Sequence, residues 1–181
     1  MFDFSKNYFE LFGMPIGFVI DAGELATRYR ELQKVVHPDR FAAAGQASQR
    51  LSLQGATLVN EAYETLRDPL RRAQYLLRLR GVEIDAQQHT LNDPAFLMQQ
   101  MELRESLAGV RGAADPMAAL DGLMREIGQM IKSQVAQLVV QLEDGSPEQL
   151  GAAVQTVQKM QFLNKLHAEA EAIEADLEEA L

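Results

Sequence analysis

The sequence predicts an all-α protein, with an antiparallel helical hairpin and flanking helices followed by a three-helix bundle. Apolar residues recur at helical spacing through most of the chain, and no sustained alternation of the kind typical of strands occurs. The expected helix starts also share a short polar residue followed by proline. The polar side chain accepts backbone N–H bonds, and proline at the first helical position loses no hydrogen bond. This pair occurs at 68–69, 93–94, 115–116 and 146–147.

The first half of the chain is expected to form four helices. A short helix at about residues 6–12 would close the open side of the hairpin. The first hairpin helix starts at Asp21, and Glu24 follows at the spacing of a capping box. It ends before Pro38, because the residue preceding a proline avoids the helical region. A fourth helix begins at 68–69. The apolar stripes of the hairpin comprise Leu25, Tyr29, Leu32 and Val36, and then Leu51, Leu58, Ala62 and Leu66 with Val59 and Tyr63 alongside.

Residues 81–93 are predicted to be a linker, because they contain Gly, Asp, His and Asn but no apolar period. The expected domains are therefore residues 1–80 and 94–181. The second domain is predicted to hold three helices, at roughly 94–111, 116–143 and 147–179. Three antiparallel helices are the simplest arrangement that buries their apolar stripes.

Composition narrows the classes of function. The chain has no cysteine, which excludes disulfides, thiolate metal sites and cysteine nucleophiles. Residues 1–80 carry 11 Lys and Arg against 9 Asp and Glu, whereas residues 81–181 carry 6 against 17, giving the net charge of −9. An acidic second half disfavours nucleic acid and suits a protein partner with a basic face. Simple solubility is the alternative interpretation of this charge.

The N-terminus has no basic segment leading into an apolar run and no Arg- and Ser-rich leader. No apolar stretch is long enough to span a bilayer, so no membrane partner is expected. A cytoplasmic location is the expectation, and a processed organellar form stays open.

The tripeptide His37-Pro38-Asp39 stands at the tip of the predicted hairpin. The Asp39 carboxylate could pair with an arginine of a partner, and His37 can donate or accept a hydrogen bond. Pro38 limits the freedom of the loop, so less entropy is lost on docking. Arg30 and Lys34 lie at i and i+4 on a solvent-facing strip with Arg28 nearby, which would suit an acidic surface. An ordinary turn beside an ordinary solvated face is the alternative.

Sequence blocks on both sides of this tripeptide carry a family resemblance. They are Tyr8-Phe9-Glu10-Leu11-Phe12-Gly13, Arg28-Tyr29-Arg30-Glu31-Leu32-Gln33, His37-Pro38-Asp39-Arg40-Phe41, Val59-Asn60-Glu61-Ala62-Tyr63-Glu64-Thr65-Leu66, Leu70-Arg71-Arg72-Ala73-Gln74-Tyr75-Leu76-Leu77, Ala95-Phe96-Leu97-Met98, Glu102-Leu103-Arg104-Glu105 and Phe162-Leu163-Asn164-Lys165-Leu166. Together they resemble the HscB (Hsc20) family, the J-domain co-chaperones of iron–sulphur cluster assembly. The resemblance implies that residues 1–80 form a J domain, and that its tip and basic strip bind the ATPase of an HscA- or DnaK-class chaperone and speed ATP hydrolysis.

The helix that starts at Pro94 has apolar residues on two faces. At 100° per residue, its core stripe clusters within about 40° of Phe96. The opposite face bears further apolar residues and two carboxylates, namely Leu97, Met98, Met101, Glu102 and Glu105. An exposed apolar patch edged by charge is typical of a protein-binding surface, and methionine adapts to irregular partners. A helix packed on both sides is the alternative.

The resemblance implies that this second face holds the iron–sulphur scaffold protein IscU, and it adds Phe162 to the five residues above. Phe162 rests on the resemblance alone, because the apolar stripe of the last helix changes face around residues 160–163. Gly109 departs from the family, whose members tend to carry a further acid there. This edge is therefore expected to be less charged.

The sequence predicts no catalysis, no metal site and no cofactor. His37, His89 and His167 have no second histidine at ligand spacing, and there is no P-loop, dinucleotide glycine pattern or G-x-S-x-G. A hydrolase using His37 and Asp39 would need a pocket that a stiff exposed loop does not offer. The remaining rival is a general J-domain co-chaperone for unfolded clients. Such chains usually add a Gly/Phe-rich segment and a cysteine zinc module, and neither occurs here.

Overall fold

The computed structural model describes residues 3–37, 45–82, 84 and 93–179, and every regular element in these ranges is a helix. The predicted all-α class is therefore confirmed. The chain divides into two compact units, Met1–Gly81 and Val82–Leu181. The elements are α1 (Tyr8–Phe12), α2 (Ala22–Val36), α3 (Gln46–Arg67), α4 (Pro69–Leu79), α5 (Pro94–Gly109), a single 3₁₀ turn η2 (Val110–Gly112), α6 (Pro116–Asp144) and α7 (Pro147–Glu179).

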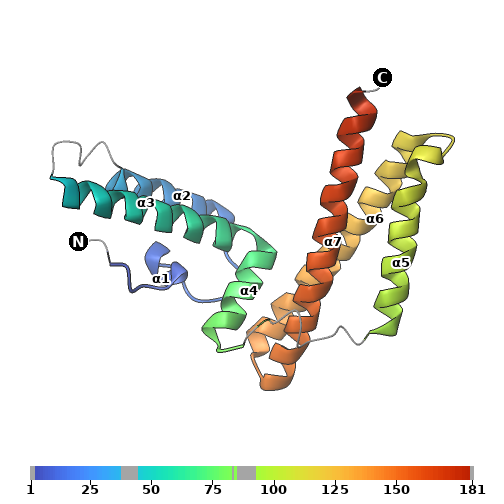
Figure 1. Ribbon diagram of the computed structural model, residues 1–181. Helices are drawn as coiled ribbons and strands as arrows, with labels where there is room; N and C mark the ends of the chain where they lie inside the picture. The colour runs from blue at the N-terminus through green and yellow to red at the C-terminus, as the bar shows by residue number, and fades with distance from the viewer. Residues whose placement is uncertain (1–2, 38–44, 83, 85–92, 180–181) are drawn as a thin grey trace. The chain divides into compact units, whose positions relative to one another are not determined.

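In the first unit, α2 and α3 form the predicted hairpin, and α1 contacts both of them (Figure 1). The short α1 is fixed at each end. Asn7 and Glu10 form a reciprocal capping box at its start, and Gly13 ends it at φ 63°, a left-handed conformation that glycine adopts without strain. α4 continues from α3 at Asp68, whose carboxylate accepts the N–H of Arg71 at 2.8 Å. The core of this unit contains Phe9, Phe12, Leu25, Val36, Val59, Ala62, Leu66, Ala73, Leu76 and Leu77.

The start of α2 is only partly the expected capping box. The Asp21 carboxylate accepts the N–H of Glu24 at 2.9 Å, as predicted. The Glu24 carboxylate is bound instead by the Arg28 guanidinium one turn later, with N···O distances of 2.6 and 2.9 Å. A charged donor at i+4 makes a stronger hydrogen bond than a neutral backbone N–H.

The expected buried stripe of α3 is wrong at its first position. Leu51 is 46% exposed, and the neighbouring Ser52 is buried. The buried line of α3 instead runs through Ser52, Gly55 and Val59. Ser52 has a specific reason to lie there, because its hydroxyl donates to the carbonyl oxygen of Val36 at 2.6 Å. That bond satisfies a carbonyl in the last turn of α2, where the helix no longer supplies a partner.

Ser52→Ala should lower the free energy of unfolding by about 1–3 kcal/mol, because it leaves the Val36 carbonyl buried without its donor. Urea denaturation followed by circular dichroism measures this loss. Thr57→Ala is the matched control, since the Thr57 hydroxyl is exposed and bonds Leu53 O within its own helix. The control should change stability by less than about 0.5 kcal/mol. Equal effects of the two substitutions would show that the Ser52 bond is not structurally important.

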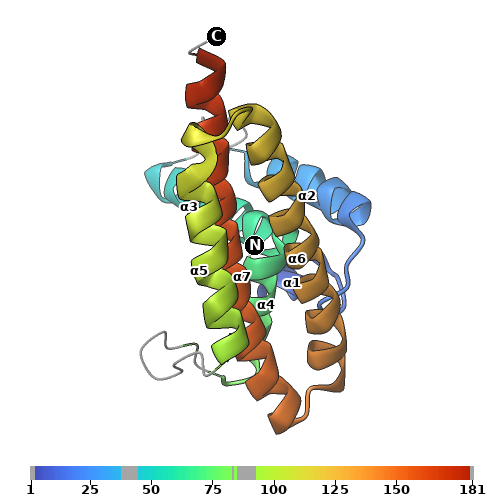
Figure 2. The same ribbon diagram turned by 90° about the vertical axis from the view of Figure 1, so that its right-hand side faces the viewer.

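In the second unit, α5, α6 and α7 run side by side as the predicted three-helix bundle (Figure 2). Each N-cap is the expected polar residue: Asp93, Asp115 and Ser146 accept backbone N–H groups at 3.0, 3.0 and 3.3 Å. α6 ends at Gly145 with φ 66°, so glycine permits the tight turn into α7. The core cluster around α5 comprises Phe96, Leu103, Leu107, Val110, Leu120, Leu123, Ile127, Leu163, Leu166 and Ala170.

None of the described helices has both the length and the hydropathy needed to cross a bilayer.

Candidate functional site

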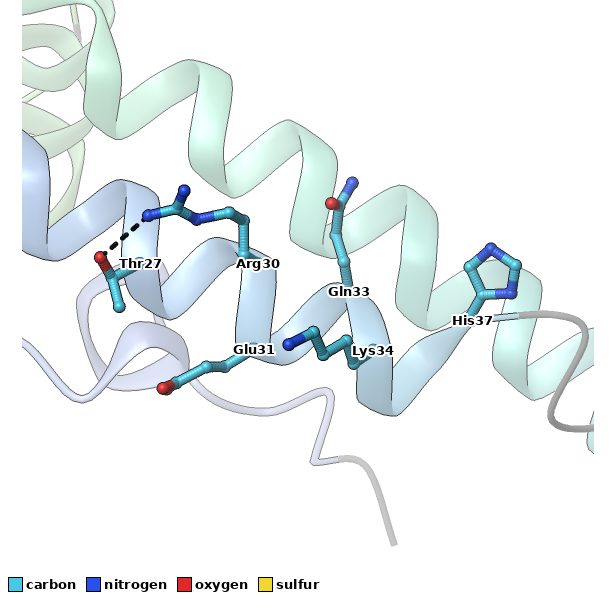
Figure 3. Close-up of a pocket in the computed structure, with 6 residues that line it drawn as sticks. All are labelled: Thr27, Arg30, Glu31, Gln33, Lys34 and His37. Atoms are coloured by element: carbon cyan, nitrogen blue, oxygen red, sulfur yellow. Dashed lines mark hydrogen bonds between the residues drawn. The ribbon is translucent and has the colours of Figure 1, made fainter.

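The basic strip of the first unit lines an open pocket on the outer face of α2 (Figure 3). Arg30, Lys34 and His37 all contribute to it, together with Thr27, Glu31 and Gln33. Arg30 donates from Nη2 to the Thr27 hydroxyl at 3.2 Å, which turns its guanidinium back along the helix. The structure therefore brings three of the six predicted chaperone-binding residues together, and all three side chains are exposed. We call Arg30, Lys34 and His37 the α2 strip.

The α2 strip ends at the tip of the hairpin. His37 is the C-cap of α2, with an extended backbone at φ −61° and ψ 128°. Pro38 and Asp39 lie outside the described residues, so their assignment to this surface stays a prediction. The strip leads directly into them along the chain.

Arg28 lies apart from this group. Its guanidinium is committed to Glu24 at 2.6 Å, and it lies so close to Gly13 that a Cβ there would be 3.0 Å from Nη1. It is also two residues from Arg30, which places it about 200° away around the helix. Arg28 therefore braces the junction between α1 and α2 in this structure, and its predicted role in chaperone binding stays untested.

A side-chain network behind the α2 strip fixes its orientation on α3. Tyr29 and Tyr63 stack with ring centroids 4.0 Å apart. The Tyr29 hydroxyl donates to Asn60 Oδ1 at 2.9 Å and accepts a hydrogen bond from Gln33 Nε2 at 2.5 Å. Gln33 thus connects this network to the pocket that it lines. Both tyrosines belong to the predicted apolar stripes, and their hydrogen bonds to side chains were not predicted from the sequence.

The second predicted surface lies on the outer face of α5 and consists of Leu97, Met98, Met101, Glu102 and Glu105, which we call the α5 face. The three apolar side chains are 46%, 64% and 72% exposed, and the two glutamates are exposed as well. The opposite side of the helix buries Phe96, Leu103 and Leu107. The expectation of two apolar faces, one of them exposed, is therefore met. An exposed run of methionine and leucine costs solubility unless a partner covers it.

Phe162 is partly buried and packs against the bundle core. Its ring meets Phe96 edge to face, with centroids 5.9 Å apart, and the Arg104 guanidinium lies 5.3 Å from the Phe162 centroid. The periodicity of α7 could not decide this point. Phe162 thus supports the base of α5 and leaves only part of its ring for a partner.

An ion pair that is not evident from the sequence secures the start of α5. Lys159 Nζ of α7 lies 2.6 Å from Asp93 Oδ2 and 5.3 Å from the Phe96 ring centroid. Hydrogen bonds from Lys159 and from the backbone N–H of Phe96 hold the pKa of Asp93 below its usual value, so this carboxylate is ionised at neutral pH. The partners are 66 residues apart, and no local pattern signals such a pair.

The described residues include His, Asp and Glu side chains, which are ligand types that hold metal ions in proteins. Among the side chains that the structure describes, no group of three or more His, Asp or Glu is arranged to hold a metal ion. The residues of the α2 strip and of the α5 face are exposed to solvent.

The chain is similar to known proteins along most of its length. Residues 92–180 match the family model described as the HSCB C-terminal oligomerisation domain. The chain is 48% identical over 171 residues to a co-chaperone protein HscB homolog of Vibrio cholerae, which covers 94% of this chain and 98% of the relative. A Shewanella amazonensis homolog of the same name is 44% identical over 168 residues, with 93% and 97% covered.

Solved structures of similar fold are also known. Chaperone HscB from Vibrio cholerae matches with a TM-score of 0.85 at 45% identity, covering 95% of this chain and 99% of that one. Human co-chaperone protein HscB matches with a TM-score of 0.84 at 30% identity, covering 95% and 84%. Both alignments cover almost all of this chain.

Proposed function

Because the chain belongs to the HscB family of J-domain co-chaperones of iron–sulphur cluster assembly, we propose that it joins two other proteins. The α5 face binds an IscU-like scaffold protein. The α2 strip, with the tip residues His37, Pro38 and Asp39, binds the ATPase of an HscA- or DnaK-class chaperone and stimulates ATP hydrolysis. The chain itself acts as an adaptor and not as an enzyme, and its bacterial relatives favour the cytoplasm as its location.

The α5 face is the single observation that carries this proposal. Leu97, Met98 and Met101 are exposed on α5, and the other side of this helix already fills the core. The fold therefore does not require apolar side chains at these three positions. Methionine side chains are flexible and polarizable, which suits contact with a folded partner surface. Glu102 and Glu105 edge this apolar surface and favour a partner with nearby basic residues.

The second unit is acidic and the α2 strip is basic, so the two surfaces select partners of opposite charge. Linking both binding sites in one chain raises the effective concentration of scaffold near the chaperone. Two weak contacts can thereby produce one delivery event without any new contact between the scaffold and this chain.

The direct test is an affinity pull-down from the native bacterial lysate, followed by an ATPase assay with the recovered chaperone. We expect both a DnaK-class ATPase and an iron–sulphur scaffold protein among the captured proteins. We also expect the purified chain and scaffold together to accelerate ATP hydrolysis beyond either one alone. Recovery of the chaperone without any scaffold protein would contradict the proposed role of the α5 face.

The rival function, general assistance to unfolded clients, predicts a different result. A holdase needs broad apolar surface for varied chains, whereas the α5 face is one short helical patch. The chain should therefore not suppress the aggregation of heat-denatured citrate synthase at equimolar ratio, as measured by light scattering. Robust suppression by the wild type that is lost in Met98→Ala with Met101→Ala would favour the rival.

A further inference from the structure

A pocket beside the α5 face has binding capacity that the bundle itself does not use. It lies within the second unit, where α5, α6 and α7 approach one another, and is lined by Asp93, Phe96, Met98, Glu102, Gln134 and Lys159 together with Ala95 and Gln99. Met98 and Glu102 belong to both surfaces, so the pocket is continuous with the α5 face. A protein bound on that face would cover the mouth of the pocket.

The polar groups of the pocket are not equally satisfied. Lys159 is neutralised by Asp93 at 2.6 Å and also faces the Phe96 ring. Glu102, in contrast, has no ion pair with any residue that the structure describes. The Gln134 Oε1 atom is buried, and it likewise has no hydrogen-bond partner within the described part of the chain. The unmet capacity of the pocket is therefore that of an acceptor, with one uncompensated negative charge.

These features indicate which kind of side chain the pocket can bind as its guest. The Phe96 and Met98 side chains offer apolar contact for a hydrocarbon stem, and the exposed Glu102 carboxylate offers an oxygen acceptor for its end. The buried Gln134 Oε1 becomes a second acceptor when its carboxamide turns toward the pocket. Lysine and arginine combine an apolar stem with a charged donor, and both lay such stems along apolar surfaces. A carboxylate guest would be repelled by Glu102 and would leave Gln134 Oε1 without a donor.

We propose that this pocket receives a lysine or arginine side chain of the protein bound on the α5 face, with Gln134 as a specificity-determining residue. The inference rests on the proposed function and deepens it, since it assigns the partner a basic residue beside its apolar contact. An unpaired buried amide oxygen costs stability in the free protein. Its hydrogen bond in the complex then adds affinity and selects against partners that lack a cation at this position.

Gln134→Met tests the proposal, because methionine keeps the length of the side chain and removes the acceptor. The substitution should keep or raise the melting temperature, since it removes a buried group without a partner. It should nevertheless lower the affinity for the scaffold by about tenfold, as measured by isothermal titration calorimetry. A loss of this size corresponds to one hydrogen bond to a charged group. A purely structural role for Gln134 would not lower affinity while preserving stability.

Gln141→Met is the matched control. Gln141 lies on the same helix, and its Oε1 is also buried without a partner among the described residues, but it does not line the pocket. Its substitution should leave scaffold affinity unchanged. Gln134→Lys is the second variant: its own ammonium would occupy the pocket beside Glu102, and affinity should fall by at least about tenfold.

Met101→Ala distinguishes a failure of the pocket proposal from a failure of the proposed function, because Met101 lies on the α5 face and outside the pocket. Scaffold binding that is weakened by Met101→Ala but unchanged by both Gln134 variants would overturn the pocket and leave the α5 face intact. Binding that is unchanged by all three variants would overturn both. Weakening by all three, with Gln141→Met at the wild-type affinity, is the expected result.

Discussion

Asp39→Asn should abolish the stimulation of the partner chaperone's ATPase and leave scaffold binding unchanged. The substitution keeps the size of the side chain but removes the charge that can pair bidentately with an arginine. Charge-assisted pairs that lose one partner cost about 2–5 kcal/mol, which corresponds to a loss of roughly 30-fold or more. Single-turnover ATP hydrolysis by the chaperone, measured with saturating scaffold, gives the stimulation. Calorimetric titration of the scaffold gives the unaffected second activity.

Two arginines of α2 supply an internal comparison for this experiment. Arg30 lies in the α2 strip, whereas Arg28 is paired with Glu24 on a different side of the helix. Arg30→Ala should therefore reduce ATPase stimulation several-fold through a weaker encounter, with little effect on stability. Arg28→Ala should affect stimulation less than Arg30→Ala does. Full stimulation by Asp39→Asn, or a larger loss in Arg28→Ala than in Arg30→Ala, would contradict the proposed chaperone surface.

The fold could be predicted from local signals because each helix carries its own. The pairs at 68–69, 93–94, 115–116 and 146–147 locate four helix starts, since capping depends on residues adjacent in sequence. The error at Leu51 has a different origin. Periodicity ranks leucine above serine, but a buried hydroxyl is favourable where it meets an unsatisfied carbonyl. The Val36 carbonyl that Ser52 satisfies is 16 residues away, so no local pattern reveals it.

The candidate sites show the same difference between features set by neighbouring residues and features set by residues distant in sequence. Periodicity alone placed Met98 and Met101 opposite the core of α5, because one helix repeat relates all of these positions. The state of Phe162 depends on Phe96 and Arg104, which belong to another helix. The pair of Lys159 and Asp93 and the pocket around Gln134 also require three helices to be brought together. The exposure of one helix face can therefore be predicted from sequence, whereas contacts assembled between helices cannot.

Met98→Ala combined with Met101→Ala should weaken scaffold binding by about 10- to 100-fold, because both side chains would lose the apolar contact proposed for them. Isothermal titration calorimetry with the apo scaffold measures the loss. Both side chains are mostly exposed in this chain. The free energy of unfolding should therefore change by less than about 0.5 kcal/mol. ATPase stimulation by the isolated chain, without scaffold, should be retained, since the α2 strip is not altered.

Leu103→Ala is the control that separates binding from folding, because Leu103 lies on the same helix but is 3% exposed in the bundle core. It should lower the free energy of unfolding by about 2–5 kcal/mol, through lost burial and the cavity left behind. A comparable loss of stability in the methionine pair would show that these side chains are packed and not available to a partner. Wild-type affinity in a stable methionine variant would remove the α5 face from the scaffold interface. The expected outcomes of the two substitutions would place the proposed partner contact and the folding core on opposite sides of one helix.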